Sequence, residues 1–390
     1  MAINFGIKDV RTIVNELHNQ MTDRSALVAT NTGEYVSQAT TLLGVGVDNV
    51  YNELMIRISK VVFSTRNYTP HFKGLYKDDL AWGGIITKTS MADKDTPFDD
   101  KAYHDIVDGQ TVDHYVINKP DLLQMRFYGS VVYQDMVSYY RVQIKNALLN
   151  ESEMAGLLNL IANEMNNKWT QWREDMARGL VANYIGAKVQ LDNGVFHLLT
   201  EYKEATGQDD FTKEDIYKKE NVKPFFEWVK ARINTLSRQM TERSGAFQVT
   251  VKEKKINRHT PYDRQKIYLG ADYLDIIDAT VLTEAYHNSG LKYADVEGVS
   301  YWQAFEKPNE IKVTPNVIDE NGEYQDGTEQ NVTDIFGVIF DTDAMGIHVV
   351  ENIIVNTPLN ARGLYYNTWL TSNVKYTTDL TEKGIVLLLD

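Results

Sequence analysis

One stretch of regular apolar spacing, from Asn150 to Gly186, limits what this chain can fold into more than any other feature. Its apolar residues recur every three or four positions, at Met154, Leu157, Leu158, Ile161, Met165, Trp169, Trp172, Met176, Leu180 and Tyr184. This spacing predicts one amphipathic helix of roughly ten turns, about 50 Å long at about 1.5 Å per residue. Few globular domains need so long a helix, so the segment indicates a scaffold and identifies no chemistry.

Both ends of this helix carry recognisable signals. Asn150 is suited to cap the free N–H groups with Glu153 three residues later, and Gly186 is suited to the left-handed residue that ends a helix. One side of the helix is expected to be buried and the other to face solvent or a partner. The candidate packing residues on the buried side are Leu158, Met165, Trp169, Trp172 and Met176.

Composition excludes several classes of protein. The 390 residues include no cysteine, which excludes disulfides, thiolate catalysis and cysteine-ligated metal sites. The formal net charge of -14 repels nucleic acid unless a local basic patch compensates. No apolar run of about 18 residues is present, so no membrane span is predicted. The first six residues lack the pattern of a secretory signal, which favours synthesis in a cytosol.

The chain before the long helix is expected to contain an arm and a projecting hairpin. Residues 1–62 have helical spacing near Lys8–Gln20 and Val47–Val61, and a polar loop is predicted at Asn31–Glu34. In residues 63–129 two runs, Trp82–Thr87 and Thr111–Ile117, are predicted to pair as a hairpin with an acidic tip. So many residues with few core formers would be unusual inside a compact domain. We therefore expect this hairpin to contact another chain, through the candidate residues Trp82, Ile85, Asp99, Asp100, Tyr115 and Ile117.

Around the long helix the sequence mixes helical and strand-like segments. A strand is predicted at Leu123–Gly129 and a helix at Gln134–Leu149. After Gly186 the sequence predicts a hairpin turn at Asn193–Gly194, a capping box from Thr212 to Asp215 and helices at Val222–Arg243, Tyr273–Ala279 and Val281–Asn288. Strands are predicted at Ile311–Val313, Ile335–Phe340, Gly346–Val350 and Ile385–Leu389. The grouping of helices with mixed strands indicates the α+β class.

No catalytic motif is present. Gly44-Val45-Gly46 begins like a dinucleotide loop but lacks the third glycine, and neither a Gly-x-Ser-x-Gly nor a His-Glu-x-x-His sequence occurs. The segment Asp341–Gly346 resembles the start of a calcium loop, yet it lies between two predicted strands and is expected to be a turn. The basic stretch Lys252–Lys266 is a candidate nucleic-acid or intersubunit patch. We expect no catalytic residue, metal site or cofactor.

The order of these segments resembles that of the major capsid protein of tailed bacteriophages, whose fold is called HK97-like. The residues that carry the resemblance are Ile117–Pro120 in the hairpin, the helix at 150–186, Asp341–Gly346 and Tyr376–Leu380. In size and in the absence of cysteine the chain is most similar to the shell proteins of small podophages of Gram-positive bacteria.

This resemblance implies a structural protein of the virion that self-assembles into the icosahedral shell around double-stranded DNA. It implies an N-terminal arm (1–62), an extended β-hairpin loop (63–129), a peripheral domain (130–190) with its spine helix (150–186), an axial domain (191–360) and C-terminal strands (361–390) that return to the peripheral domain. The implied partners are further copies in pentamers and hexamers, packaged DNA through non-specific contact, and portal and scaffolding proteins, with no membrane. The protein would be made in the host bacterial cytoplasm.

Two alternatives remain open at this stage. Another phage structural component, such as a portal or tail protein, would also fit a long helix, although a portal is expected to carry longer helical stretches. A carbohydrate-active hydrolase would need paired carboxylates, with Trp82, Trp302 or Trp369 stacking on sugar.

Overall fold

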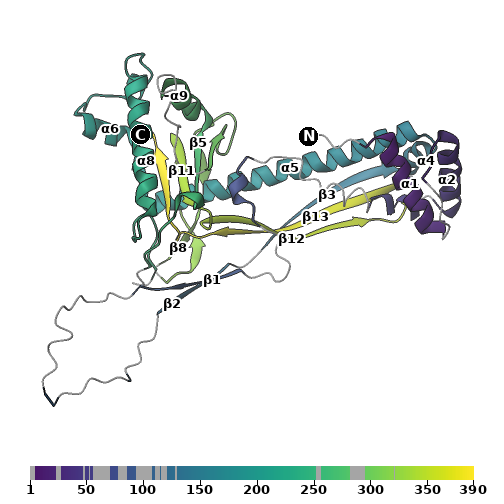
Figure 1. The fold of residues 1–390 in the computed structure, drawn as a ribbon, viewed down its shortest axis with the longest axis horizontal. Helices are drawn as coiled ribbons and strands as arrows, with labels where there is room; N and C mark the ends of the chain where they lie inside the picture. Colours follow the sequence, from purple (N-terminus) through teal and green to yellow (C-terminus); the bar gives the residue numbers. More distant parts are fainter. Residues whose placement is uncertain are drawn as a thin grey trace.

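The structure is a computed structural model that describes residues 5–22, 28–46, 49–51, 53–55, 71–77, 86–93, 108–109, 115, 121–127, 130–251, 256–281, 295–319 and 321–390. The molecule is long and narrow, with a group of helices at one end and a mixed lobe at the other (Figure 1). Helix α5 (Glu151–Gln190, 40 residues) connects the two ends. The predicted long helix is thus confirmed, and it continues four residues beyond its expected end.

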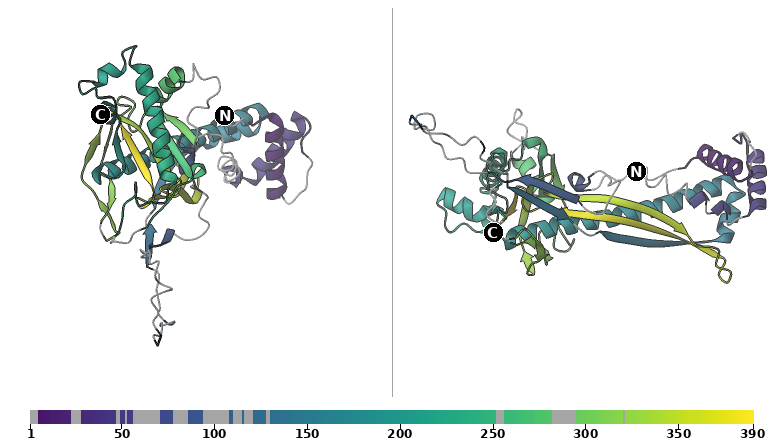
Figure 2. Two further views of the ribbon diagram at one scale, coloured as in Figure 1. Left: turned by 60° about the vertical axis from the view of Figure 1, so that its left-hand side comes forward. Right: turned by 90° about the horizontal axis from the view of Figure 1, so that it is seen from below.

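A three-stranded antiparallel sheet lies along α5 (Figure 2). Its strands are β3 (Val131–Tyr140), β13 (Tyr365–Thr378) and β12 (Met345–Asn356), with β13 in the centre. Side chains alternate across β13: Tyr366, Leu370 and Val374 are buried, as are Thr368 and Ser372 on the same face, whereas the residues that alternate with them from 365 to 373 are partly exposed. One face of this sheet therefore packs on the molecule and the other faces outward.

At the far end of α5 lie α1 (Ile7–Thr22), α2 (Thr32–Val45) and α4 (Arg141–Leu148) (Figure 1). Residues 49–51 and 53–55 are also helical. The apolar side of α1 packs with the first half of α5 in one hydrophobic cluster. Arg11 ties the two helices together because its Nε donates to Glu151 Oε2 at 2.9 Å.

The opposite end is built on a five-stranded mixed sheet in the order β4 (Val195–His197), β14 (Gly384–Leu388), β11 (Ile335–Asp341), β5 (Gln265–Gly270) and β6 (Asp295–Val299). Every residue of β11 and β14 is buried, because helices cover both faces. The second half of α5 packs on one face. The other face is covered by α6 (Leu198–Thr206), α8 (Val222–Thr241) and α9 (Ala271–Val281).

Shorter elements complete the described chain. Strands β7 (Ile311–Val313) and β10 (Gln330–Val332) pair with each other, as do β8 (Asn316–Ile318) and β9 (Tyr324–Asp326). The chain also contains α7 (Lys213–Ile216) and the 3-10 turns η1 (Lys73–Leu75) and η2 (Tyr262–Arg264). Strands β1 (Ile86–Met91) and β2 (Leu122–Phe127) form a separate two-stranded ribbon that leaves the body (Figure 1).

Several predicted elements are confirmed. The helix at Lys8–Gln20 is α1, the helix at Val222–Arg243 is α8, and Tyr273–Ala279 lies within α9. Asn150 caps α5 by accepting from the Ser152 N–H at 3.0 Å, and the Thr212 capping box is present. The strands predicted at the C-terminal end correspond to β7, β11, β12 and β14. The helix predicted at Val281–Asn288 lies, after its first residue, outside the described residues.

Gly186 does not end the long helix, and that prediction was wrong. The residue is buried inside α5, where a Cβ atom would lie 2.6 Å from Val313 Cγ1. Glycine is needed there for the close approach of β7. The hairpin predicted at Asn193–Gly194 was also wrong: this turn joins α5 to β4, and β4 pairs in parallel with β14.

Three predictions before the long helix also need correction. Asn31 is the N-cap of α2 and Glu34 lies inside that helix, because the Asn31 side chain accepts from the Glu34 N–H at 3.0 Å. The first part of the helix predicted at Gln134–Leu149, up to Tyr140, is β3, whose burial alternates with period two, and the helix α4 begins only at Arg141. Of the two runs predicted to pair as a hairpin, Ile86 and Thr87 pair with Phe127 and Arg126 of β2, and the remaining residues apart from Tyr115 lie outside the described residues.

Candidate assembly surface

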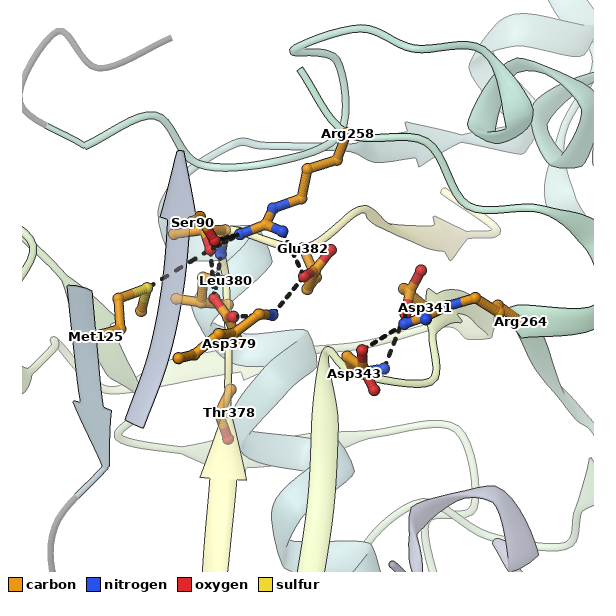
Figure 3. A network of polar contacts seen from close by, with 12 residues as sticks. Ser90, Met125, Arg258, Arg264, Asp341, Asp343, Thr378, Asp379, Leu380 and Glu382 are labelled. Carbon is orange, nitrogen blue, oxygen red and sulfur yellow. Dashed lines mark hydrogen bonds and ion pairs between the residues drawn. The ribbon is translucent and has the colours of Figure 1, made fainter. Parts of the chain in front are cut away.

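The ribbon is attached to the body by a buried ionic cluster, which we call the clasp and which consists of Lys88, Arg258, Asp379 and Glu382. Lys88 points inward from β1, and its ammonium group contacts the Asp379 Oδ2 atom at 2.5 Å as well as the Glu382 carboxylate. Arg258 Nη1 lies 2.8 Å from Glu382 Oε1. Figure 3 shows Arg258 reaching across Ser90 of β1 toward Glu382. Two acids from one turn thus face two bases from distant segments.

The turn between β13 and β14 positions the two acids of the clasp. Asp379 Oδ1 accepts from both the N–H and the hydroxyl of Thr381, at 2.9 and 2.6 Å. This is the local side chain-to-backbone bonding that favours aspartate in turns. The side chains of Asp379 and Glu382 are only 2% and 7% exposed, so few solvent contacts compete with the clasp.

Burial and charge act in opposite directions on the ionisable groups of the clasp. Burial by itself would lower the pKa of Lys88, but the carboxylates of Asp379 and Glu382 outweigh it and raise that pKa. Burial raises the pKa of Glu382, and the nearby Lys88 and Arg258 only partly oppose this shift. The lysine therefore stays charged throughout the neutral range, and its charge keeps the ribbon on the body.

Arg264 makes a second, separate ionic contact at the turn between β11 and β12 (Figure 3). Its Nη2 lies 2.9 Å from Asp341 Oδ1, and it also contacts the Asp343 carboxylate. This confirms Asp341–Gly346 as a turn between two strands. Arg258 and Arg264 of the predicted basic patch bind carboxylates of their own chain, and Lys252–Lys255 lie outside the described residues.

The aromatic residues of α5 pack between the helix and the three-stranded sheet. Trp172 stacks on Tyr133 of β3, with 4.5 Å between the ring centroids, and also contacts Trp169. Leu158, Met165 and Trp169 are buried, whereas Trp172 and Met176 are half-buried.

The outer face of the three-stranded sheet carries exposed apolar side chains. Met136, Trp369 and Val355 lie directly across the three strands from one another. Met136 is 41% exposed and Val355 is 53% exposed. A row of apolar side chains on the open face of a sheet is typical of a contact surface.

The candidate contact residues of the hairpin are mostly not described. Trp82, Ile85, Asp99, Asp100 and Ile117 lie outside the described residues, whereas Tyr115 is described and is 90% exposed. Among the residues that the structure describes, no group of three or more acidic or histidine residues is placed to hold a metal ion. In that same part of the chain no helix is both long and apolar enough to cross a membrane.

Comparison with known proteins identifies the family. A family model described as "Phi29-like phage major capsid protein" matches residues 10–388. The chain belongs to this family of capsid proteins. Among curated proteins, none matches the sequence of this capsid protein significantly.

Two solved structures share the fold. A chain in the capsid structure of Staphylococcus phage Andhra is 11% identical with a TM-score of 0.52, covering 82% of this capsid protein and 84% of that chain. A chain in the structure of the head fiber and inner core protein gp22 of native bacteriophage P68 is 10% identical with a TM-score of 0.50, again covering 82% and 84%. At such low identities the likeness supports the fold alone. The α+β, HK97-like fold predicted from the sequence is confirmed.

This capsid protein is therefore a structural component of the phage shell, as predicted. Family membership favours a shell protein over the portal, tail and hydrolase alternatives. The clasp was missed by sequence reasoning because Lys88 and Asp379 are 291 positions apart. The only sequence signal was the pair of acids three residues apart in Asp379–Glu382, and nothing there indicates which bases they would meet.

Proposed function

We propose that the capsid protein builds its shell from pentamers and hexamers in which the segment 63–129 of one subunit lies across a neighbouring subunit. In this proposal α5 acts as the spine of a peripheral domain (130–190), residues 191–360 form the axial domain and residues 361–390 return toward the spine. The observation that supports it best is the ribbon, which leaves the body and is held at its base by the clasp.

One face of the ribbon is held by its own subunit, because Ala92, Leu123 and Met125 are buried in the core and Asp93 pairs with Arg243 at 2.5 Å. The other face is open: Met91 at the end of β1 is 63% exposed, and two strands alone are marginally stable in water. A second copy can supply the missing contacts, since an extended segment gains stability when a neighbour covers it. The row Met136, Trp369 and Val355 on the open sheet face is the apolar surface that we expect such a neighbour to cover.

The strands of the C-terminal segment refine this division. β13 belongs to the sheet beside α5, whereas β14 lies at the centre of the five-stranded sheet. We therefore propose that residues 365–378 serve the peripheral domain and residues 384–388 serve the axial domain.

We also propose a purely structural role, without enzymatic activity, and synthesis in the host bacterial cytoplasm. Contact with packaged DNA would be non-specific, because the net charge of -14 disfavours tight binding and Arg258 and Arg264 already pair with carboxylates. Portal and scaffolding proteins are proposed as further partners.

A loop replacement tests the role of the hairpin. Residues 94–120 are replaced by Asn-Gly, which joins the ribbon just beyond its last backbone bond, from the Ala92 N–H to the Asp121 carbonyl at 2.8 Å. We expect the variant to fold with an unchanged helix signal and to form no closed shells by electron microscopy. Closed shells of normal size from this variant would show that the hairpin has no role in assembly.

A further inference from the structure

A half-open pocket of about 820 Å³ lies beside the base of the ribbon. Its walls come from β2, α5, the β8–β9 hairpin and the end of β13. The apolar lining consists of Met125, Phe127, Met176, Leu180, Tyr324 and Tyr376. Two charged residues of opposite sign, Arg126 and Glu323, also line it. Its size and its mixture of apolar walls with a few polar groups are typical of a binding site.

Glycine keeps the floor of this pocket open. Gly179 lies inside α5 and lines the pocket, and a Cβ atom built there would have no neighbouring atom within 4 Å. Glycine is a poor residue for a helix interior compared with alanine, and here no close packing requires it. This differs from Gly186 of the same helix, which faces Val313. A side chain at position 179 would instead project into the pocket.

The same chain presents an exposed aromatic side chain on a well-held turn. Phe305 is 78% exposed, and its nearest aromatic contact is Tyr301, with 5.9 Å between the ring centroids. Phe305 and Glu306 are the central residues of a tight turn that is closed by the Lys307 N–H donating to the Ala304 carbonyl at 3.2 Å. Such positions favour glycine, asparagine, aspartate or serine over phenylalanine.

The base of this turn is anchored in the body. Trp302 is buried, and its backbone N–H donates to the Pro308 carbonyl at 2.9 Å. Gln303 exchanges two hydrogen bonds with the backbone of Lys312, at 2.6 and 2.9 Å. The turn therefore presents Phe305 in one fixed position.

The turn and the pocket lie on different sides of α5. The Tyr301 ring, next to Phe305, contacts Arg178, whose Cζ lies 3.6 Å from the ring centroid. The pocket contacts α5 at Met176, Gly179, Leu180 and Asn183. At about 100° of rotation per residue, these positions lie about 100° to 160° around the helix axis from Arg178. The turn that carries Phe305 therefore lies outside the pocket of its own subunit.

We propose that the turn of one subunit, with Phe305 at its tip, inserts into the pocket of the next subunit. Glu306, which directly follows Phe305, is complementary in charge to Arg126 at the pocket, whereas Lys307 pairs with Glu310 of its own turn at 2.6 Å. The two surfaces are different parts of one chain, so the contact is head-to-tail, and its repetition closes a ring where the rotation between subunits closes. The inference rests on assembly of this chain into a shell, and it adds a contact that does not depend on residues 94–120, the part removed in the loop replacement.

Filling the pocket tests its role without damaging the fold. Gly179→Leu places an apolar side chain in the pocket, and the matched control Gly156→Leu changes a second α5 glycine that also has open space around its Cβ position but does not line the pocket. Each full-length variant is expressed with the other structural genes of its phage. We expect both to fold, and we expect Gly179→Leu alone to reduce the yield of sedimenting shells at least tenfold. Equal yields from the two variants, high or low, overturn the proposal.

A cross-link tests the identity of the occupant. Because the natural chain has no cysteine, the double variant with Phe305→Cys and Gly179→Cys can form only engineered disulfides. We expect a ladder of disulfide-linked oligomers on a non-reducing gel, and no ladder when Gly156→Cys replaces Gly179→Cys. Absence of the ladder at protein concentrations at which the natural chain assembles overturns the pairing. Failure of the natural chain to form shells would instead refute the shell function itself.

Discussion

The clasp predicts that Lys88→Met destabilises the subunit far more than loss of a surface ion pair does. Lys88 is 24% exposed and faces carboxylates that are 2% and 7% exposed, so the variant leaves two buried acids with one base fewer. Breaking a buried ion pair by removing one partner costs about 3 to 5 kcal/mol. We expect about 3 kcal/mol, because Arg258 still compensates Glu382.

The free energy of unfolding is measured by urea denaturation, and amide hydrogen exchange of Ile86–Met91 reports whether the ribbon itself is released. The control is Lys168→Met, which removes the more exposed pair with Asp135 and is expected to cost less than about 1 kcal/mol. Adding Asp379→Asn to Lys88→Met should restore part of the lost stability, because Asp379 is the buried carboxylate that loses its base whereas Glu382 keeps Arg258. A loss from Lys88→Met no larger than that from Lys168→Met would refute this account of the clasp.

Five further substitutions along α5 test its packing and the burial of its one fully buried lysine. Trp169→Ala should lower the unfolding free energy by about 3 to 5 kcal/mol, and Trp172→Ala should lower it by less, because only Trp169 of the two is buried. Calorimetry should show that these variants lose folding before they lose assembly. Gly186→Ala should cost about 1 to 3 kcal/mol through its contact with Val313, whereas Gly156→Ala should stabilise by up to about 1 kcal/mol in the same urea assay. Burial lowers the pKa of Lys188 to about 7. We therefore expect the unfolding free energy of the natural chain, compared with that of Lys188→Met, to rise between about pH 7 and about pH 10.5 by at most about 1.4 kcal/mol per pH unit. If the difference between the two unfolding free energies stayed constant over that range, this expectation would be wrong.

The sign of the pH effect follows from which state holds the proton. Lys188 is fully buried, and its Nζ donates to Asn193 Oδ1 at 3.0 Å and to the Phe247 carbonyl at 2.8 Å; within the described part of the chain no carboxylate forms an ion pair with it. Between the lowered folded pKa and the ordinary unfolded pKa, the unfolded chain binds the proton more strongly. Raising the pH through that range removes this advantage of the unfolded chain.

Local patterns were sufficient for the elements whose burial repeats along the sequence. In α8 the residues at three- and four-residue spacing are all buried, from Phe225 to Met240. The core of α5 was predictable for the same reason, and so was the buried run of β11. Strand β13 was missed because its threonine, serine and asparagine residues give no apolar alternation, and its buried Thr368 bonds to Asn356 only once the sheet has formed.

The sequence by itself determined that this chain carries one long helix, a core-poor segment before it and an α+β remainder, because these depend on spacing and composition. Only the tertiary structure decided what individual residues do. From the sequence Gly186 was predicted to end a helix, but Val313 packs closely against it in the helix interior. Arg258 and Arg264 were predicted to form a basic patch, but both pair with carboxylates of their own chain. Contacts between residues hundreds of positions apart depend on the tertiary fold of the whole chain, and no local sequence pattern predicts them.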